Sequence, residues 1–185
     1  MQDYREFLKE ILIPEDKLQK RVAEMGAEIS RDYKDSEDLL LVCILRGGVL
    51  FLTDLMRNIK IPHAIEFMAV SSYGVGRRES SGSVRITLDL FCDIKGRDVI
   101  IVEDIIDSGN TLAAVIDMLS VREPKSICIC TLLDKFERRE VDVPVCYTGF
   151  AIPNEYVFGY GLDIDDYYRN LPFIGIVDPE KYTGR

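Results

Sequence analysis

The most informative stretch of the chain is Val99-Ile100-Ile101-Val102-Glu103-Asp104-Ile105-Ile106-Asp107-Ser108-Gly109-Asn110-Thr111-Leu112. Its β-branched beginning is typical of a parallel strand that is buried on both faces. Apolar residues recur at helical spacing from Leu112 onward, so the turn at 107–111 connects a strand to a helix N-terminus. Backbone N–H groups point outward at such a terminus and bind anions. The sequence therefore predicts a phosphate-binding turn at 107–111.

The acidic residues before this turn narrow the choice of ligand. The chain has no Gly-x-x-x-x-Gly-Lys-Ser/Thr motif, whose lysine would reach the phosphates of a nucleoside triphosphate. Instead, Glu103 and Asp104 stand at the end of the strand. Two carboxylates repel a phosphate unless they face hydroxyl groups or a hydrated metal ion. We therefore expect a sugar phosphate, such as ribose with its 5′-phosphate in the turn and its hydroxyls on the carboxylates.

A second strand–turn–helix unit lies earlier in the chain. Residues 39–45 form an apolar run, Arg46-Gly47-Gly48 forms a turn, and residues 49–59 have a helical pattern. In open α/β sheets, ligands bind at the carboxyl ends of the strands, where the strand order reverses. We therefore expect the turns at 46–48 and 107–111 to lie at one site.

The remaining pattern predicts an α/β fold with a mostly parallel, twisted sheet flanked by helices. Pro14-Glu15-Asp16 opens a helix. The additional strand-like segments are 64–70, 126–133, 145–149, 156–161 and 173–177. We expect the C-terminal tail to form a small hood over the sheet. The length suits one domain over residues 1–185, with neither an internal repeat nor a linker.

Composition restricts the partners. Lys and Arg total 23 against 32 Asp and Glu, which gives a net charge of −9. This balance opposes binding to nucleic acid and to anionic membranes. No apolar run approaches membrane-spanning length, and residues 1–6 lack the pattern of a signal peptide. We expect a soluble cytoplasmic protein whose small anionic substrate needs local cations or magnesium.

The stretch 99–112 resembles the ribose-phosphate-binding motif of the type I phosphoribosyltransferases. Val-Glu-Asp-Ile-Ile-Asp-Ser-Gly-Asn-Thr at 102–111 is similar to the hypoxanthine and hypoxanthine-guanine branch in particular. Further matching pieces, in family order, are Leu45-Arg46-Gly47-Gly48, Ser71-Ser72-Tyr73-Gly74, Leu133-Asp134-Lys135, Ile152-Pro153-Asn154-Glu155-Tyr156-Val157, Gly159-Tyr160-Gly161-Leu162-Asp163 and Arg169. The resemblance thus covers nearly the whole chain.

The resemblance implies a Mg²⁺-dependent transferase of purine salvage. Such an enzyme moves the phosphoribosyl group of phosphoribosyl pyrophosphate to N9 of hypoxanthine or guanine and forms IMP or GMP and pyrophosphate. Relatives commonly form homodimers or homotetramers. The loop at 71–82, with Ser72 and Tyr73, is expected to be a flexible lid that closes over the site; the alternative is a solvated hairpin tip.

The resemblance also implies roles at the ribose and its phosphate. Glu103 and Asp104 would hold the ribose hydroxyls, directly or through Mg²⁺-bound water, and Asp107 would be the general base and acid at purine N7. The 5′-phosphate would bind the backbone and hydroxyl groups of Ser108, Gly109, Asn110 and Thr111. Without the acidic residues, this turn would read as an ordinary capped helix start.

Pyrophosphate would meet Arg46 and Gly47, since an arginine fork suits it and glycine allows close approach. The family usually has lysine in place of Arg46, often after a non-proline cis peptide. The sequence does not show whether the Leu45-Arg46 bond is cis or trans. Asp163 would bind a second Mg²⁺, and Arg169 would pair with pyrophosphate. The run Asp163-Ile164-Asp165-Asp166 also fits the start of a helix. We expect Asp165 and Asp166 to serve that helix start.

Three residues would bind the purine. Lys135 would donate to O6, which hypoxanthine and guanine offer and adenine does not. Tyr156 would stack on the ring, and the Val157 backbone would read the base edge. The alternatives are a solvent-facing Lys135 and a core Tyr156. Glu155 departs from the lysine often found there, so no contact is carried over to it.

Two other functions stay open. One is an RNA-binding regulator with the phosphoribosyltransferase fold, against which the net charge of −9 argues. The other is an enzyme that prefers xanthine or adenine, because acceptance of xanthine depends on the pocket geometry at purine C2.

Overall fold

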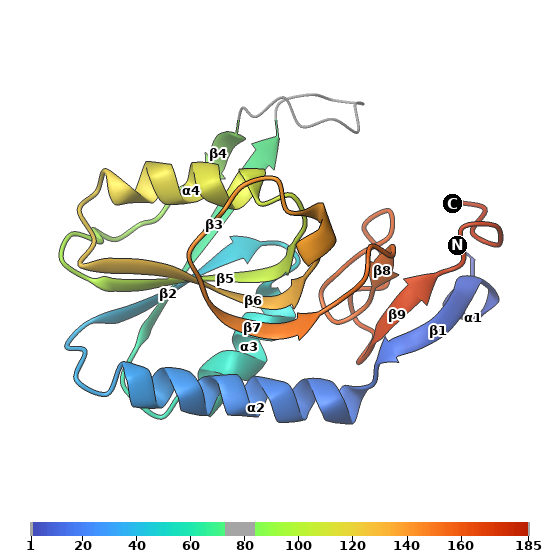
Figure 1. Cartoon of the computed structure of the whole chain (residues 1–185), viewed down its shortest axis with the longest axis horizontal. Helices are drawn as coiled ribbons and strands as arrows, with labels where there is room; N and C mark the ends of the chain where they lie inside the picture. The colour runs from blue at the N-terminus through green and yellow to red at the C-terminus, as the bar shows by residue number, and fades with distance from the viewer. Residues whose placement is uncertain (1, 73–83, 185) are drawn as a thin grey trace.

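A six-stranded sheet lies at the centre of the computed structural model, which describes residues 2–72 and 84–184 (Figure 1). Its strands are β2 (Leu39–Leu45), β3 (Ala64–Ser72), β4 (Val84–Leu88), β5 (Asp98–Ile106), β6 (Ser126–Asp134) and β7 (Val145–Ala151). They follow the order β4-β3-β2-β5-β6-β7, and every pair is parallel except β3 with β4. The predicted mostly parallel α/β sheet is confirmed.

Helices cover both faces of this sheet (Figure 1). The long helix α2 (Glu15–Asp32) and α3 (Val49–Asn58) pack on one face, and α4 (Asn110–Ser120) packs on the other. Alternate residues of β2 enter the two cores, Leu41 and Cys43 toward α2 and α3, and Leu40 and Val42 toward α4. Burial on both faces explains why the strand sequence is apolar throughout. Each fully buried aliphatic side chain stabilises the fold by about 1.5–3 kcal/mol.

A smaller antiparallel sheet forms the hood. Its strands are β1 (Leu8–Ile13), β9 (Ile174–Val177) and β8 (Val157–Phe158), in that order, and the one-turn helix α1 (Tyr4–Phe7) precedes it. Figure 1 shows the hood beyond the carboxyl ends of the parallel strands. The prediction of a hood from the C-terminal tail was incomplete, since β1 from the start of the chain pairs with β9 and since β7 belongs to the main sheet.

The strand order reverses between β2 and β5. From β2 the chain continues to β3 on one side, whereas β5 pairs with β2 on the other side. The turns that follow β2 and β5 therefore meet at one crevice, which is where open α/β sheets bind ligands. Within the described ranges, none of the helices combines the length and the apolar character that a membrane crossing requires.

Candidate active site

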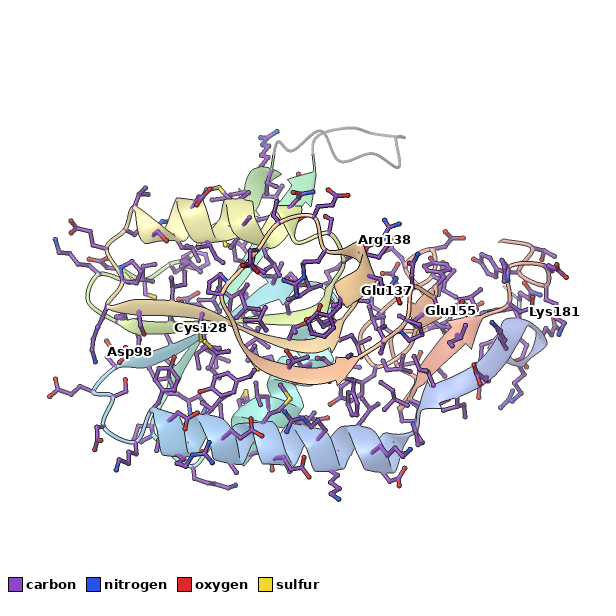
Figure 2. All side chains as sticks on the ribbon, viewed as in Figure 1. Asp98, Cys128, Glu137, Arg138, Glu155 and Lys181 are labelled. Carbon is purple, nitrogen blue, oxygen red and sulfur yellow. The ribbon has the colours of Figure 1, made fainter. Side chains whose placement is uncertain are left out.

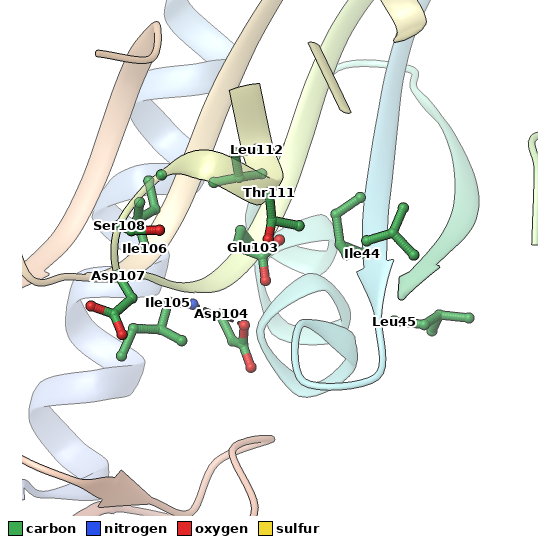
Figure 3. A pocket seen from close by; sticks show the side chains of 12 residues that line it. Ile44, Leu45, Glu103, Asp104, Ile105, Ile106, Asp107, Ser108, Thr111 and Leu112 are labelled. Atoms are coloured by element: carbon green, nitrogen blue, oxygen red, sulfur yellow. Dashed lines mark hydrogen bonds between the residues drawn. The ribbon is translucent and has the colours of Figure 1, made fainter. Parts of the chain in front are cut away.

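A cavity of about 270 Å³ lies at this crevice (Figure 3). It is lined by Ile44 and Leu45 at the end of β2, by Val70 of β3 and by most of the stretch 103–112. In Figure 3 the carboxyl groups of Glu103, Asp104 and Asp107 lie below the turn that leads into α4. The structure therefore brings the predicted carboxylates and the predicted phosphate turn into one cavity.

Glu103 and Asp104 form a closely spaced carboxylate pair. Burial, followed by repulsion from Asp104, holds the pKa of Glu103 well above its ordinary value, although the side chain keeps one face open to the cavity. Asp104 Oδ1 accepts a hydrogen bond from the Ile105 N–H at 2.9 Å. A divalent cation would offset the repulsion, and carboxylate oxygens are ligands that Mg²⁺ prefers.

The pair thus fits the metal that the sequence predicts. It supplies two of the ligands, and among residues 2–72 and 84–184 no group of three or more His, Cys, Asp or Glu side chains gathers around one point. Substrate oxygens and water would have to complete the coordination, as is usual for Mg²⁺.

The turn after β2 approaches the carboxylate pair through its backbone. The Leu45-Arg46 peptide bond is cis, as the family pattern suggested. A Cβ at Gly47 would lie 1.6 Å from Asp104 Oδ2, and a Cβ at Gly161 would lie 2.1 Å from the Gly47 carbonyl oxygen. Gly161 also has φ of 103°, which favours glycine. The turn after β2, the Asp104 side chain of β5 and the loop at Gly161 therefore meet where no further side chain fits between them.

The turn at 107–111 has the geometry of a helix N-terminus. Gly109 is the N-cap of α4 with φ of 86°, and Ser108 Oγ accepts the Asn110 N–H at 3.4 Å. Ser108 and Thr111 line the cavity. The Asn110 amide instead donates to Glu140 Oε2 at 2.6 Å, so Asn110 offers its backbone alone to a ligand. The partial positive charge of the helix start favours an anion there.

A contact with Arg138 adds a cation beside Asp107. Arg138 Nε donates to Asp107 Oδ1 at 2.9 Å, and both side chains are half exposed. Arg138 ends the 3₁₀ helix at Phe136–Arg138, after β6. Figure 2 places it at the end of the sheet that faces the hood, opposite Asp98. The sequence did not predict this partner, because nothing in the local pattern links two residues 31 positions apart.

The predicted purine residues have well-defined surroundings. Lys135 follows β6 and is only 8% exposed, so the solvent-facing alternative was wrong. No carboxylate among the described residues forms an ion pair with its ammonium group. Tyr156 is 55% exposed, so the core alternative was wrong as well, whereas Val157 is buried in β8. Tyr156 borders an open hollow with Asp163, and burial followed by nearby carboxylates raises the pKa of its hydroxyl.

Asp163 and Arg169 form an ion pair with 2.7 Å between Oδ1 and Nη2, and Arg169 Nη1 also donates to the Gly161 carbonyl at 2.7 Å. The prediction of a helix start at 163–166 was wrong. Ile164 and Tyr167 pair as a two-residue hairpin, in which Asp165 and Asp166 have φ of 51° and 72°. Such hairpin turns require left-handed residues, and aspartate tolerates that conformation.

Comparisons with known proteins agree with this arrangement. The model of the phosphoribosyl transferase domain family matches residues 13–165. A hypoxanthine phosphoribosyltransferase from Salmonella typhimurium is 53% identical over 169 residues, which cover 91% of this chain and 94% of the relative. The chain belongs to the hypoxanthine-guanine phosphoribosyltransferase family.

Two further members of this hypoxanthine-guanine phosphoribosyltransferase family show how far the likeness extends. A hypoxanthine-guanine phosphoribosyltransferase from Mycobacterium avium is 50% identical over 180 residues, which cover 95% of this chain and 88% of the relative. The crystal structure of a hypoxanthine phosphoribosyltransferase from Staphylococcus aureus superposes with a TM-score of 0.93 at 43% identity and covers 98% of this chain and 97% of that chain. The predicted type I phosphoribosyltransferase fold is confirmed.

The family site divides into two groups in this structure. Glu103, Asp104, Asp107 and the turn at 107–111 lie together around the cavity. The second group, Tyr156, Asp163 and the partner Arg169, lies in the loops next to the hood. Gly161 joins the two groups through its contact with Gly47. The predicted lid residue Tyr73 lies outside the described residues, as does most of the loop at 71–82, and the Ser72 side chain is not described either.

Proposed function

We propose that this chain catalyses purine salvage by transferring the phosphoribosyl group of phosphoribosyl pyrophosphate to N9 of hypoxanthine and guanine. The products are IMP or GMP and pyrophosphate. The observation that carries the proposal is the cavity in which the Glu103 and Asp104 carboxylates adjoin the N-terminus of α4. An anion site next to two carboxylates matches a ribose 5-phosphate, with its charge at one end and its hydroxyls at the other. The activities named for the relatives support the choice of purine.

In this proposal the turn anchors the substrate. The 5′-phosphate binds the N–H groups of Gly109 and Thr111 and the hydroxyls of Ser108 and Thr111, and the Asn110 backbone adds another donor. Glu103 and Asp104 accept from the ribose hydroxyls or hold Mg²⁺ next to them. Fixing the phosphate and the hydroxyls together orients the ribose C1 toward the purine.

Mg²⁺ would bind at Glu103 and Asp104, and a second ion at Asp163. When bound, the metal supplies positive charge that neutralises pyrophosphate as it leaves. Arg46 and Arg169 add two guanidinium groups that match phosphate oxygens, and the Gly47 backbone comes close because it carries no side chain. The residues present thus oppose the negative charge that develops on the leaving group.

The purine is selected and activated by the other side of the site. Lys135 donates to O6, Tyr156 stacks on the ring, and the Val157 backbone contacts the base edge. Asp107 holds or accepts the proton at N7 as N9 attacks the ribose C1. The Lys135 side chain is 8% exposed and has no carboxylate partner among the described residues, so its ammonium group favours an acceptor at C6 over the amino group of adenine.

The test is pyrophosphate release from phosphoribosyl pyrophosphate and MgCl₂, with hypoxanthine, guanine, xanthine, adenine and uracil offered separately. We expect turnover with hypoxanthine and guanine, and loss of turnover in Asp104→Asn. Asp93→Asn removes an exposed carboxylate and serves as the control. Wild-type turnover in this variant would show that the loss in Asp104→Asn arises at the site. Activity on uracil alone, or no activity, would overturn the proposal in favour of the RNA-binding regulator. Turnover mainly with xanthine or adenine would overturn the choice of base.

A further inference from the structure

Arg46 is already occupied by a carboxylate of the same chain. Its Nη2 forms an ion pair with Asp166 Oδ1, across 120 positions of sequence. The same Asp166 oxygen lies 3.5 Å from Nη2 of Arg169. Asp166 therefore bridges the two arginines that the proposed function assigns to pyrophosphate, one from the turn after β2 and one from the loop that follows β8.

The backbone holds Asp166 in this place. Ile164 N–H donates to the Tyr167 carbonyl at 3.2 Å, and Tyr167 N–H donates to the Ile164 carbonyl at 3.0 Å, so 164–167 is closed as a hairpin. The Asp166 N–H also donates to Asp163 Oδ2 at 2.8 Å. The turn is thus fixed from both sides, and its second aspartate projects its carboxylate to Arg46.

A carboxylate and a phosphate oxygen use the same donors of a guanidinium group. Pyrophosphate therefore cannot take the Arg46 nitrogen that Asp166 occupies until this ion pair opens. The pair is open to solvent, with Arg46 66% and Asp166 54% exposed, so it is weak and reversible. It would lower the affinity for pyrophosphate without abolishing binding.

We propose that Asp166 is an internal competitor of pyrophosphate, which pairs with Arg46 in the free protein and so sets the affinity for pyrophosphate and for phosphoribosyl pyrophosphate. The inference rests on the proposed function. The consequence for the reaction is faster product release, because the ion pair between Asp166 and Arg46 forms again as pyrophosphate leaves. Asp166 thus acts on the affinity through Arg46 and is not itself a catalytic residue.

The neighbouring aspartate provides a matched control. Asp165 occupies the same hairpin turn, also with a left-handed φ, and its Oδ2 accepts from the Tyr182 hydroxyl at 2.7 Å. Asp165→Asn and Asp166→Asn each remove one negative charge from this turn, and asparagine tolerates left-handed φ. A general electrostatic effect would appear in both variants, whereas release of Arg46 would appear in Asp166→Asn alone.

The experiment is calorimetric titration of pyrophosphate with MgCl₂ into the full chain, together with KM for phosphoribosyl pyrophosphate. We expect Asp166→Asn to bind pyrophosphate about 3- to 5-fold more tightly, in line with a weak exposed ion pair. The KM should fall in parallel, and Asp165→Asn should stay within about 2-fold of the wild type. In an Arg46→Gln background, Asp166→Asn should have a smaller effect, because only its 3.5 Å contact with Arg169 Nη2 remains.

Several results would overturn the inference. Equal affinities in Asp165→Asn and Asp166→Asn would mean that only total charge matters. Weaker binding in Asp166→Asn would mean that Asp166 supports the ligand instead of competing with it, and an undiminished effect in the Arg46→Gln background would exclude action through Arg46. If the wild type turns over hypoxanthine, these results reject only the proposal that Asp166 competes with pyrophosphate. If the wild type neither binds pyrophosphate nor turns over any purine, the proposed function is rejected together with the competition by Asp166.

Discussion

Gly47 approaches Asp104 so closely that a Cβ at position 47 would lie 1.6 Å from the Asp104 Oδ2 atom. Any side chain at 47 must therefore displace this carboxylate or the turn that follows β2. Because Asp104 belongs to the pair that we assign to ribose and Mg²⁺, the glycine determines where that pair can lie.

We expect Gly47→Ala to lower kcat/KM for phosphoribosyl pyrophosphate by about 100-fold or more, since a displacement of about 1 Å at a reacting site has that effect. The overall fold should persist, because the change touches one loop. Gly96→Ala is a control for activity alone: its Cβ meets no atom within 4 Å, so it should retain wild-type kcat/KM, whereas the φ of 74° should make it less stable. Steady-state kinetics beside circular dichroism would measure both. An active Gly47→Ala enzyme would contradict the proposed position of Asp104.

Asp107→Asn tests the assigned proton transfer. Asparagine keeps an oxygen that accepts the hydrogen bond from Arg138 Nε, so the local structure should survive. We expect kcat to fall by about 100-fold or more, the usual contribution of a general base or acid. Binding of phosphoribosyl pyrophosphate should change little, and the exposed Asp142→Asn should be neutral. Unchanged turnover would remove Asp107 as the base.

Lys135 should be necessary for activity but not for the fold. Its side chain is 8% exposed and has no ion-pair partner among the described residues, so the fold gains no ion pair from its charge. Lys135→Met should therefore keep the melting temperature while it lowers kcat/KM for hypoxanthine by about 10- to 100-fold, through loss of a charged hydrogen bond. The exposed Lys34→Met should change neither. A large drop in melting temperature with retained activity would contradict the assignment.

Asp98 gives the fold an acid-sensitive contact far from the site (Figure 2). Burial acts to raise its pKa, but hydrogen bonds from Ser36 at 2.6 Å and Ser126 at 2.7 Å, with an ion pair to Lys125, hold the pKa below its ordinary value. A lowered folded-state pKa stabilises the protein above the unfolded-state value of about 3.9, and the gain is lost as the pH falls through the folded-state pKa.

Asp98→Asn should accordingly lower the free energy of unfolding by about 1–3 kcal/mol at pH 7. The difference from the wild type should shrink as the pH falls below about 4. Urea titrations at several pH values would measure it, and the exposed Asp35→Asn should stay within about 0.5 kcal/mol of the wild type throughout. A difference that does not depend on pH would show that the charge is not the stabilising feature.

Local sequence was sufficient for most of the fold and for the cavity. The start of α2 at 14–16, the buried run of β5 and the turn at 107–111 follow from periodicity and turn chemistry, which are local properties. The shared location of Arg46 and Glu103 follows from the rule that parallel strands end at one edge. The phosphate-binding turn and the role of Glu103 and Asp104 at the ribose followed from residue chemistry, the other residue roles came from the family resemblance, and all of them stay predictions.

Long-range pairing explains what the sequence did not predict. The sequence of β1 is short and mixes apolar with charged residues, so it does not predict a strand by itself. Its partner β9 lies more than 160 positions away. The contacts of Arg46 with Asp166 and of Arg138 with Asp107 also depend on loops brought together by the fold. At 163–166, acidic residues that suit a helix start equally suit a left-handed hairpin, and only the pairing of Ile164 with Tyr167 decides between them.

The pairing of β1 with β9 has a consequence for biosynthesis. As the chain leaves the ribosome, β1 emerges more than 160 residues before β9, so β1 lacks its neighbour while the residues between them are made. The main sheet can assemble in that interval, with Glu103 and Asp104 in place. Asp163 and Arg169 lie between β8 and β9, so the carboxylates that we assign to the ribose can be in place before these two residues are.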